Sequence, residues 1–173
     1  MDTHLFFCGI KHCGKSTLGR LVAQKMGTFC VDNDDLILAD LHGYPSIRAM
    51  YKKEGKASFM EKETETLKRY LENNNQKCIV SLGGGACDNL PLISLIKRYG
   101  KVVYLQVDEK VLLKRILVDG IPPFLDSQDV EGSFAALYAD RHERYRKLSD
   151  IMVKLPDYPD IKDTATFLFS SLS

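Results

Sequence analysis

The chain has 173 residues, 45% of them hydrophobic and 27% charged, a composition typical of a globular domain and too apolar for a disordered chain. Its 24 Lys and Arg against 23 Asp and Glu leave a formal net charge of +1. We therefore expect neither a nucleic acid nor a membrane surface as partner, because both attract a basic excess. No run of about 18 apolar residues occurs, and the start Met1-Asp2-Thr3-His4 lacks the basic region of a signal peptide. We expect a cytoplasmic protein, and nothing in the sequence requires more than a monomer.

The cysteines agree with a reducing compartment. They stand at positions 8, 13, 30, 78 and 87, an odd number without a C-x-x-C pair, and the four histidines form no metal-ligand spacing with them. We expect reduced thiols, mostly buried as small hydrophobic side chains, and no structural zinc site.

Strands and helices are predicted to alternate along the chain. In order, the patterns predict a strand at 4–10, a helix at 16–26, a strand at 28–31, helical structure up to residue 41, a helix at 59–71, a loop at 72–76, a strand at 77–82, a helix at 90–99, a strand at 101–107, helices at 109–117 and 130–148, a strand at 151–154 and a helix at 164–171. Apolar strands between helices are typical of a parallel sheet covered on both faces. We predict a single α/β domain over 1–173, a three-layer α/β/α sandwich around a five-stranded parallel sheet, with its ligand site at the carboxyl ends of the strands.

A phosphate-binding motif follows the first strand directly. Residues 9–16 read G-I-K-H-C-G-K-S and match G-x-x-x-x-G-K-[ST] between a strand and a helix, a context that disfavours a chance match in a glycine turn. Gly9 and Gly14 allow successive backbone N–H groups to surround phosphate oxygens, and the following helix adds its positive end. We expect an exposed Lys15 to reach the β- and γ-phosphates of ATP, and the hydroxyl of Ser16 to bind Mg²⁺.

Two acidic residues follow the second strand. Asp32 and Asp34 are separated by one residue, so both side chains point to the same side if the segment is extended. One carboxylate can hold a metal through water, and the other can accept a hydrogen bond from a substrate hydroxyl. The alternative is structural: Asp34 or Asp35 caps the next helix.

Three consecutive glycines, Gly83, Gly84 and Gly85, follow the third predicted strand. Without side chains they let a ligand approach the backbone, and they expose N–H donors. A flexible turn between strand and helix is the alternative interpretation.

Together these segments resemble a known family. The phosphate loop, V-D-N-D-D at 31–35, S-L-G-G-G-A at 81–86 and R-H-E-R-Y at 141–145 occur in the order seen in shikimate kinases, and the resemblance covers essentially the whole chain. It implies a P-loop kinase fold similar to that of nucleoside-monophosphate kinases, with a substrate-binding region at about 33–62 and a short mobile lid at about 118–128. It also implies transfer of the γ-phosphoryl group of ATP to the 3-hydroxyl of a small-molecule substrate, shikimate, with Mg²⁺ as cofactor.

The resemblance implies roles for individual residues. Lys15 and Asp34 look like the catalytic residues, Asp34 also binding the substrate hydroxyls, and Asp32 resembles the carboxylate that orients Mg²⁺ beside Ser16. The substrate-binding groups would be Asp34, Gly83, Gly84, Gly85 and Arg141, the last as a clamp on the substrate carboxylate. The nucleotide-binding residues would be Gly9, Lys11, His12, Cys13, Gly14, Lys15, Ser16, Thr17 and Arg115, the last lying against adenine.

Helical periodicity supports the role of Arg141 independently. Within the predicted helix 130–148, Arg141 lies at i+7 from Phe134, inside an apolar stripe. A guanidinium aimed inward needs a partner, which an anionic ligand can supply. A side chain whose stem lies along the core while its head reaches water would show the same pattern.

Two departures from the family pattern concern the phosphate loop and the acceptor. His12 stands at a glycine position of the phosphate loop. The family motif F-R-x-x-E reads F-M-E-K-E at 59–63, so Met60 replaces the arginine that binds the substrate carboxylate, and Glu63 loses its expected partner.

A third departure concerns the lid. The motif R-P-L-L reads I-P-P-F at 121–124, and no Lys or Arg occurs between Ile116 and Asp140. The lid therefore lacks an arginine for the transferring phosphoryl group.

Three hypotheses follow from these observations. The first is a shikimate kinase. The second is a kinase of the same fold that acts on another hydroxylated metabolite, because Met60 makes the acceptor pocket more apolar. The third is a nucleotide-binding protein with little turnover, which the missing lid arginine favours and the intact phosphate loop and acidic pair disfavour.

Overall fold

A five-stranded parallel sheet forms the centre of the computed structural model, which describes residues 3–118, 120–121 and 125–172. The strands are β1 (His4–Cys8), β2 (Cys30–Asp32), β3 (Ile79–Ser81), β4 (Gly100–Gln106) and β5 (Ile151–Lys154). Their order is β2-β3-β1-β4-β5, and every neighbouring pair is parallel, which confirms the predicted sheet. The order reverses at β1, so the crevice for a ligand is expected at its carboxyl end.

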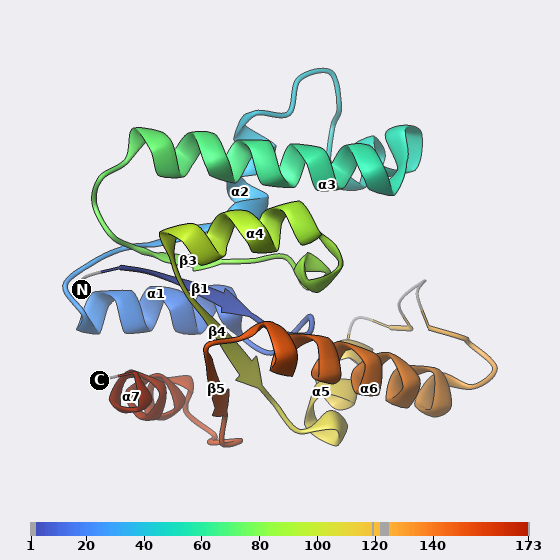
Figure 1. Ribbon diagram of the computed structural model, residues 1–173. Helices are drawn as coiled ribbons and strands as arrows, with labels where there is room; N and C mark the ends of the chain where they lie inside the picture. Colours follow the sequence, from blue (N-terminus) through green and yellow to red (C-terminus); the bar gives the residue numbers. More distant parts are fainter. Residues whose placement is uncertain (1–2, 119, 122–124, 173) are drawn as a thin grey trace.

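Helices cover both faces of this sheet (Figure 1). They are α1 (Lys15–Lys25), α2 (Asn33–Ala39), α3 (Ile47–Asn73), the 3₁₀ helix η1 (Ala86–Asp88), α4 (Leu90–Tyr99), α5 (Glu109–Leu117), α6 (Val130–Leu148) and α7 (Ile161–Ser171). On one face α1 packs beside α7, and on the other α4 packs beside α3, while α6 contacts β4 and η1. None of the helices in the described part of the chain is long and apolar enough to span a membrane.

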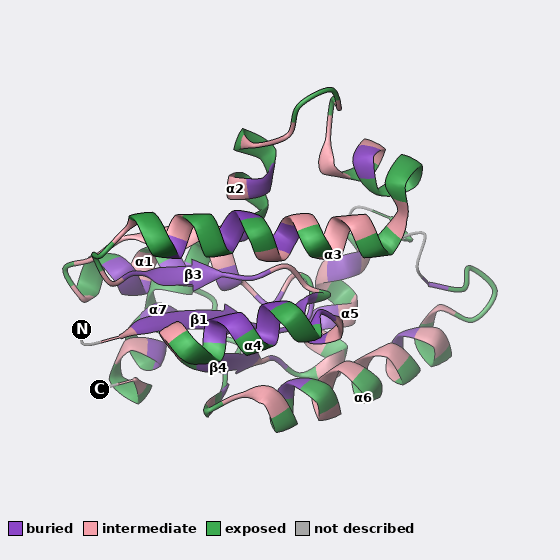
Figure 2. Ribbon diagram, turned by 45° about the horizontal axis from the view of Figure 1, so that its top comes forward, coloured by how far each residue is buried: buried purple, intermediate pink, exposed green. Residues whose placement is uncertain are grey.

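The sequence explains why these elements form and where they begin. All five residues of β1 are buried, as expected for a central strand with helices on both sides (Figure 2). Six helices begin with a side chain that accepts a backbone N–H of the first turn, each such cap contributing about 1 kcal/mol. The capping residues are Asp32, Ser46, Asn89, Asp108, Asp129 and Asp160.

Aromatic side chains fix α6 on the sheet. Tyr104 of β4 stacks on Tyr145 of α6 with ring centroids 5.3 Å apart, and the Tyr104 hydroxyl lies 3.0 Å from Nδ1 of His142. These contacts set the rotation of α6 about its axis, and therefore the direction in which Arg141 projects.

The main error of the sequence prediction concerns α3. The helix predicted at 59–71 begins at Ile47 and includes the first two residues of the predicted loop 72–76. It consists of two helical segments (Figure 2). They are joined at Gly55, whose φ of 83° is not helical. The lysine-rich first segment lacks a clear apolar stripe, and the glycine interrupts the period, so the pattern hid this part of the helix.

All five cysteines carry free thiols, as predicted, and Cys8, Cys13, Cys78 and Cys87 are buried. In the described part of the chain, no group of three or more His, Cys, Asp and Glu side chains could hold a metal ion.

Candidate active site

The carboxyl ends of β1, β2 and β3 bring the predicted polar groups together. Asp32 ends β2 and lies in register with Ser81, the last residue of β3. The hydroxyl of Ser16, at the start of α1, donates a hydrogen bond of 2.5 Å to Asp32 Oδ2 and lies 3.1 Å from the hydroxyl of Ser81. These hard oxygen atoms are of the kind that Mg²⁺ prefers. Ser81 was not predicted from the sequence as a residue of this site. Its position at the end of a buried strand, just before the glycine turn, could have indicated it.

The phosphate loop has the curvature that its sequence predicts. Gly14 has a φ of 94°, and His12 has a φ of 65°, so both adopt the left-handed backbone that turns N–H groups toward an anion. For His12 this conformation costs about 1 kcal/mol relative to the glycine that the family pattern has there. The substitution therefore keeps the shape of the loop.

The expected exposure of Lys15 is wrong. Its side chain is buried, and Nζ donates to the carbonyl oxygens of Gly9 at 2.9 Å and Ile10 at 3.2 Å. The loop folds over the lysine, and carbonyl groups satisfy its ammonium. The ammonium therefore lies inside the loop that is predicted to hold phosphate.

The expectation of an extended Asp32–Asp34 segment is also wrong. Asp32 is the N-cap of α2 and accepts the backbone N–H of Asp34 at 3.0 Å, so Asp34 lies in the first helical turn. The alternative that an aspartate caps the next helix is correct, but the capping residue is Asp32, and Asp34 and Asp35 follow it in the first turn. Both Asp32 and Asp34 nevertheless line one cavity of 230 Å³, together with Lys11, His12, Gly14, Lys15, Ser16 and Thr17.

Asp34 has the electrostatics of a base. Burial and the charge of Asp32 raise the pKa of the Asp34 carboxyl, against the opposing charges of Lys15 and Lys11. A carboxylate with a raised pKa holds a proton more readily, which favours proton acceptance from a hydroxyl group.

The glycine turn 83–85 lies against the side chains of Asp34, Glu63 and Arg141. A β-carbon at Gly83 would be 3.2 Å from Glu63 Oε1 and 3.6 Å from Asp34 Oδ1, and one at Gly84 would be 3.2 Å from the backbone nitrogen of Lys11. A β-carbon at Gly85 would be 3.5 Å from Arg141 Nη1. Of the three, only Gly84 has a backbone atom this close, so a side chain at Gly84 would press on the phosphate loop.

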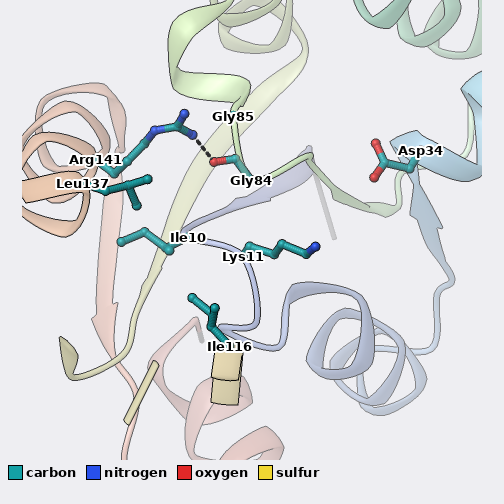
Figure 3. Close-up of a pocket in the computed structure, with 8 residues that line it drawn as sticks. All are labelled: Ile10, Lys11, Asp34, Gly84, Gly85, Ile116, Leu137 and Arg141. Carbon is teal, nitrogen blue, oxygen red and sulfur yellow. Dashed lines mark hydrogen bonds between the residues drawn. The ribbon is translucent and has the colours of Figure 1, made fainter. Parts of the chain in front are cut away.

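Arg141 projects into the site rather than to water. It donates from Nη1 to the carbonyl oxygen of Gly84, which also accepts from the Tyr145 hydroxyl at 3.0 Å, and its Nη2 lies 3.4 Å from Asp88 Oδ2. Figure 3 shows Arg141, Gly84, Lys11 and Asp34 around a cavity of 360 Å³. The inward direction predicted from the apolar stripe is confirmed.

A further cavity of 290 Å³ lies on the acceptor side, between α3 and the glycine turn. Asp34, Met60, Glu63 and Arg141 line it, together with Lys56. Met60 and Glu63 belong to the segment 59–63 that departs from the family motif. In the structure both line the predicted substrate site.

The carboxyl group of Glu63 is hydrogen-bonded to an amide group, not to an arginine. Its Oε2 accepts from Asn89 Nδ2 at 2.8 Å, and the side chain is buried. Burial raises the pKa of Glu63 to about 7, against the opposing hydrogen bond from Asn89 and with a contribution from the charge of Asp34. A neutral amide takes the place of the missing guanidinium.

Arg115 lies apart from the acceptor site. Its Nη2 is 2.8 Å from Asp157 Oδ1, and it lines a cavity of 170 Å³ with Cys13, Leu18 and Pro156. This cavity borders the phosphate loop at Cys13. Of the predicted lid at 118–128, residues 119 and 122–124 lie outside the described part of the chain.

Comparison with known proteins identifies the family. The family model for shikimate kinase matches residues 11–168, almost the whole chain. The chain belongs to the shikimate kinase family. Among curated shikimate kinases, that of Neisseria gonorrhoeae is 32% identical over 169 residues, covering 98% of this chain and 95% of the relative. That of Stenotrophomonas maltophilia is 35% identical over 162 residues, covering 94% and 88%.

Solved shikimate kinases have the same fold. The Acinetobacter baumannii enzyme, solved in complex with shikimate, matches with a TM-score of 0.81 and 26% identity, covering 98% of this chain and 92% of that one. The Aquifex aeolicus shikimate kinase matches with a TM-score of 0.76 and 26% identity, covering 98% and 95%. The predicted α/β kinase fold and the family resemblance are confirmed.

Proposed function

We propose that this protein transfers the γ-phosphoryl group of ATP to the 3-hydroxyl of shikimate. The observation that carries the proposal is the convergence of Lys15, Asp34 and Arg141 around the glycine turn. A phosphate-binding loop, a carboxylate with a raised pKa and an inward guanidinium there line adjoining cavities. Membership of the shikimate kinase family supports the choice of donor and acceptor.

The nucleotide is proposed to lie along the phosphate loop. Its β- and γ-phosphates would accept hydrogen bonds from the loop N–H groups and from Lys15, and the positive end of α1 would add to the attraction. The adenine base would occupy the cavity between Arg115 and Pro156, where a guanidinium and a proline ring offer flat surfaces.

Ser16 and Asp32 are the proposed holders of Mg²⁺. The donor set fits the ion, because hydroxyl and carboxylate oxygens meet within hydrogen-bond distance beside the phosphate loop. When bound, Mg²⁺ would neutralise developing charge on the phosphate oxygens.

Asp34 is the proposed base for the acceptor hydroxyl. It would accept the hydroxyl proton as the new O–P bond forms and the bond to the leaving ADP oxygen breaks, and the proton would then reside on the carboxyl group. The turn 83–85 lets the hydroxyl and the γ-phosphate approach closely, and Arg141 would bind the substrate carboxylate.

Lys11 is the proposed cation beside the transferring group. It extends from the phosphate loop into the space between Gly84 and Asp34 (Figure 3), and it lines both the nucleotide-side and the larger cavity. With no Lys or Arg in the lid sequence between Ile116 and Asp140, Lys11 can supply positive charge there.

A second candidate is a kinase for a less acidic hydroxylated acceptor. The observation in its favour is Met60, which lines the acceptor cavity together with Phe59 and Tyr51 and provides no hydrogen-bond donor for a carboxylate.

We further propose that the protein acts in the cytoplasm as a monomer, with 33–62 as the substrate-binding region and 118–128 as the lid of a single domain.

A coupled assay of ADP release distinguishes these candidates. MgATP is supplied with shikimate or with related polyols that lack the carboxylate, and the ratio of kcat/KM is compared. The proposal expects shikimate to be the better acceptor. Preference for an uncharged polyol would favour the second candidate, and nucleotide binding without turnover on any acceptor would contradict both.

A further inference from the structure

Lys56 enters the acceptor cavity because of the break in α3. Gly55 leaves the helical conformation with a φ of 83°, and a new helical segment begins at Lys56. Lys56 and Met60 are four residues apart on this segment, so they lie on the same helix face, and both line the cavity. A lysine therefore stands one turn away from the position at which the family motif has its arginine.

Asp88 joins Lys56 to Arg141. Lys56 Nζ lies 3.1 Å from Asp88 Oδ2, and Arg141 Nη2 lies 3.4 Å from the same oxygen. The other oxygen, Oδ1, lies 3.4 Å from Nη1 of Arg144. Two cations that line the cavity, one from α3 and one from α6, thus converge on a single carboxylate oxygen.

The environment favours a charged carboxylate at this point. The side chains of Asp88 and Arg141 are 19% and 22% exposed, so their attraction is only partly screened by water. Burial acts to raise the pKa of Asp88, but the hydrogen bond from Lys56 and the charges of Arg141 and Arg144 outweigh it, and the pKa is lowered.

Because Lys56 and Arg141 both bind the carboxylate of Asp88, the carboxylate of a ligand is the kind of group that they fit. We propose that Lys56 and Arg141 together form the site for the acceptor's carboxylate, and that Asp88 is a resident counter-ion that this carboxylate must displace or share. Lys56 then strengthens the binding of acidic acceptors, and Asp88 weakens it. The inference rests on the proposed function, since it names the residues that set acceptor specificity at that site.

The remaining acids of the cavity sharpen this inference. Asp34 and Glu63 line the same cavity as Asp88, so a bound carboxylate meets three acidic groups. Without Lys56, Arg141 would be the one cation among the described lining residues. Because lysine lacks the planar fork of arginine, the pair Lys56–Arg141 binds a carboxylate less rigidly than two arginines would.

The test measures binding of shikimate by isothermal titration calorimetry to the wild type and to three variants. Lys56→Gln should raise the Kd about five- to ten-fold, the effect of losing a partly exposed charge-assisted hydrogen bond. Asp88→Asn should lower the Kd about five-fold, because the two cations lose their resident partner. Lys52→Gln is the matched control, since Lys52 is an exposed lysine of the same helix that lies outside the lining of the cavity.

The methyl ester of shikimate separates a charge effect from a structural one. It lacks the carboxylate, so Lys56→Gln and Asp88→Asn should change its Kd less than two-fold. If Asp88→Asn weakens shikimate and the ester equally, Asp88 merely positions Arg141 and the inference is overturned. Unchanged shikimate affinity in both variants would also overturn it.

Turnover of the wild type on shikimate, measured in parallel, tests the proposed function by itself. If turnover is present while the variants bind shikimate as the wild type does, only the carboxylate site is wrong. If turnover is absent and the variants still shift shikimate affinity in opposite directions, only the proposed function is wrong. If neither the wild type nor Asp88→Asn binds shikimate, both are wrong.

Discussion

Asp34 combines two demands on a single side chain. As the proposed base it must be ionised to accept a proton, yet it lies in the first turn of α2 beside another carboxylate. Burial and the charge of Asp32 raise its pKa, while Lys15 and Lys11 oppose the shift. This environment supports the proposed role of Asp34 as proton acceptor, and the hydrogen bond from Ser16 supports Asp32 as the proposed metal ligand.

Substituting Asp34→Asn should test this division of roles. The variant keeps the shape but cannot accept the proton, so kcat should fall about 10²- to 10⁴-fold. The Kd of ADP should change less than about three-fold, because the nucleotide contacts are proposed to come from the phosphate loop. Steady-state kinetics and ADP titration check both values. A large loss of ADP affinity with surviving kcat would assign Asp34 to the metal instead.

Glu63 should make the stability of the protein depend on pH. Its folded-state pKa of about 7 lies above its ordinary value of 4.5, so the folded state binds this proton more tightly than the unfolded state does. The stabilising contribution is complete below about pH 4.5 and is lost as pH rises toward 7, where ionisation adds charge facing Asp34.

Glu63→Gln should remove this loss. We expect the melting temperature of the variant at pH 8 to exceed that of the wild type by roughly 5 °C, the equivalent of about 2 kcal/mol in a chain of this length. At pH 5 the two should melt within about 1 °C of each other. Thermal unfolding followed by circular dichroism at both pH values is the measurement, and an equal difference at both would show that Glu63 does not titrate in this range.

At the scale of elements, long apolar periods were predictable and backbone breaks were not. The helices α4, α5 and α6 and the strand β5 have the predicted bounds, because their apolar residues recur without interruption. The first segment of α3 was missed, because a glycine with positive φ breaks the helical period at Gly55.

In the candidate site, contiguous motifs were likewise predictable, and contacts between distant residues were not. The phosphate loop and the glycine turn are contiguous motifs, and the structure brings both to one edge of the sheet. Lys56 and Asp88 were not found as a pair, since they lie on different elements and meet only after the chain folds. The burial of Lys15 depends on carbonyl groups, which a pattern of side chains does not reveal.

Gly55→Ala should show whether the break in α3 positions the acceptor residues. Gly55 has a φ of 83° and a ψ of −179°, a backbone conformation that is open essentially to glycine alone, so an alanine there costs about 1–3 kcal/mol. Any straightening of the helix would move Lys56 out of the cavity. We expect the KM for shikimate to rise about three- to ten-fold, while the KM for ATP stays within two-fold.

Gly27→Ala is the matched control for this substitution. Gly27 has a φ of 68°, and, like Gly55, it has open space where a β-carbon would stand, but it follows α1 at the opposite end from the phosphate loop. It should lose stability without a change in either KM. Equal effects of both substitutions on the KM for shikimate would show that general destabilisation is the cause.

At the scale of the whole molecule, the sheet brings the proposed donor and acceptor groups to one edge, and the proposed lid contains no Lys or Arg. Phosphoryl transfer develops negative charge that a positive group stabilises. Lys11 stands beside Asp34 and Gly84, where the transferring group is proposed to pass.

Lys11→Met should therefore lower kcat about 10²-fold, with the KM for shikimate within three-fold of the wild type. Lys11→Arg keeps the charge and should retain at least about a third of the activity. Both values come from the coupled assay at saturating MgATP. A Lys11→Met variant with the kcat of the wild type would show that the transferred group does not need this cation.

Phosphorylation of the 3-hydroxyl of shikimate by this family member can be observed in its products. The most direct measurement incubates the wild type with MgATP and shikimate and identifies the products by ³¹P nuclear magnetic resonance and mass spectrometry. We predict shikimate 3-phosphate and ADP in equal amounts, with neither formed by Asp34→Asn at a comparable rate. ADP without a phosphorylated shikimate, or intact ATP after prolonged incubation with a protein that binds ADP, would contradict the proposed function.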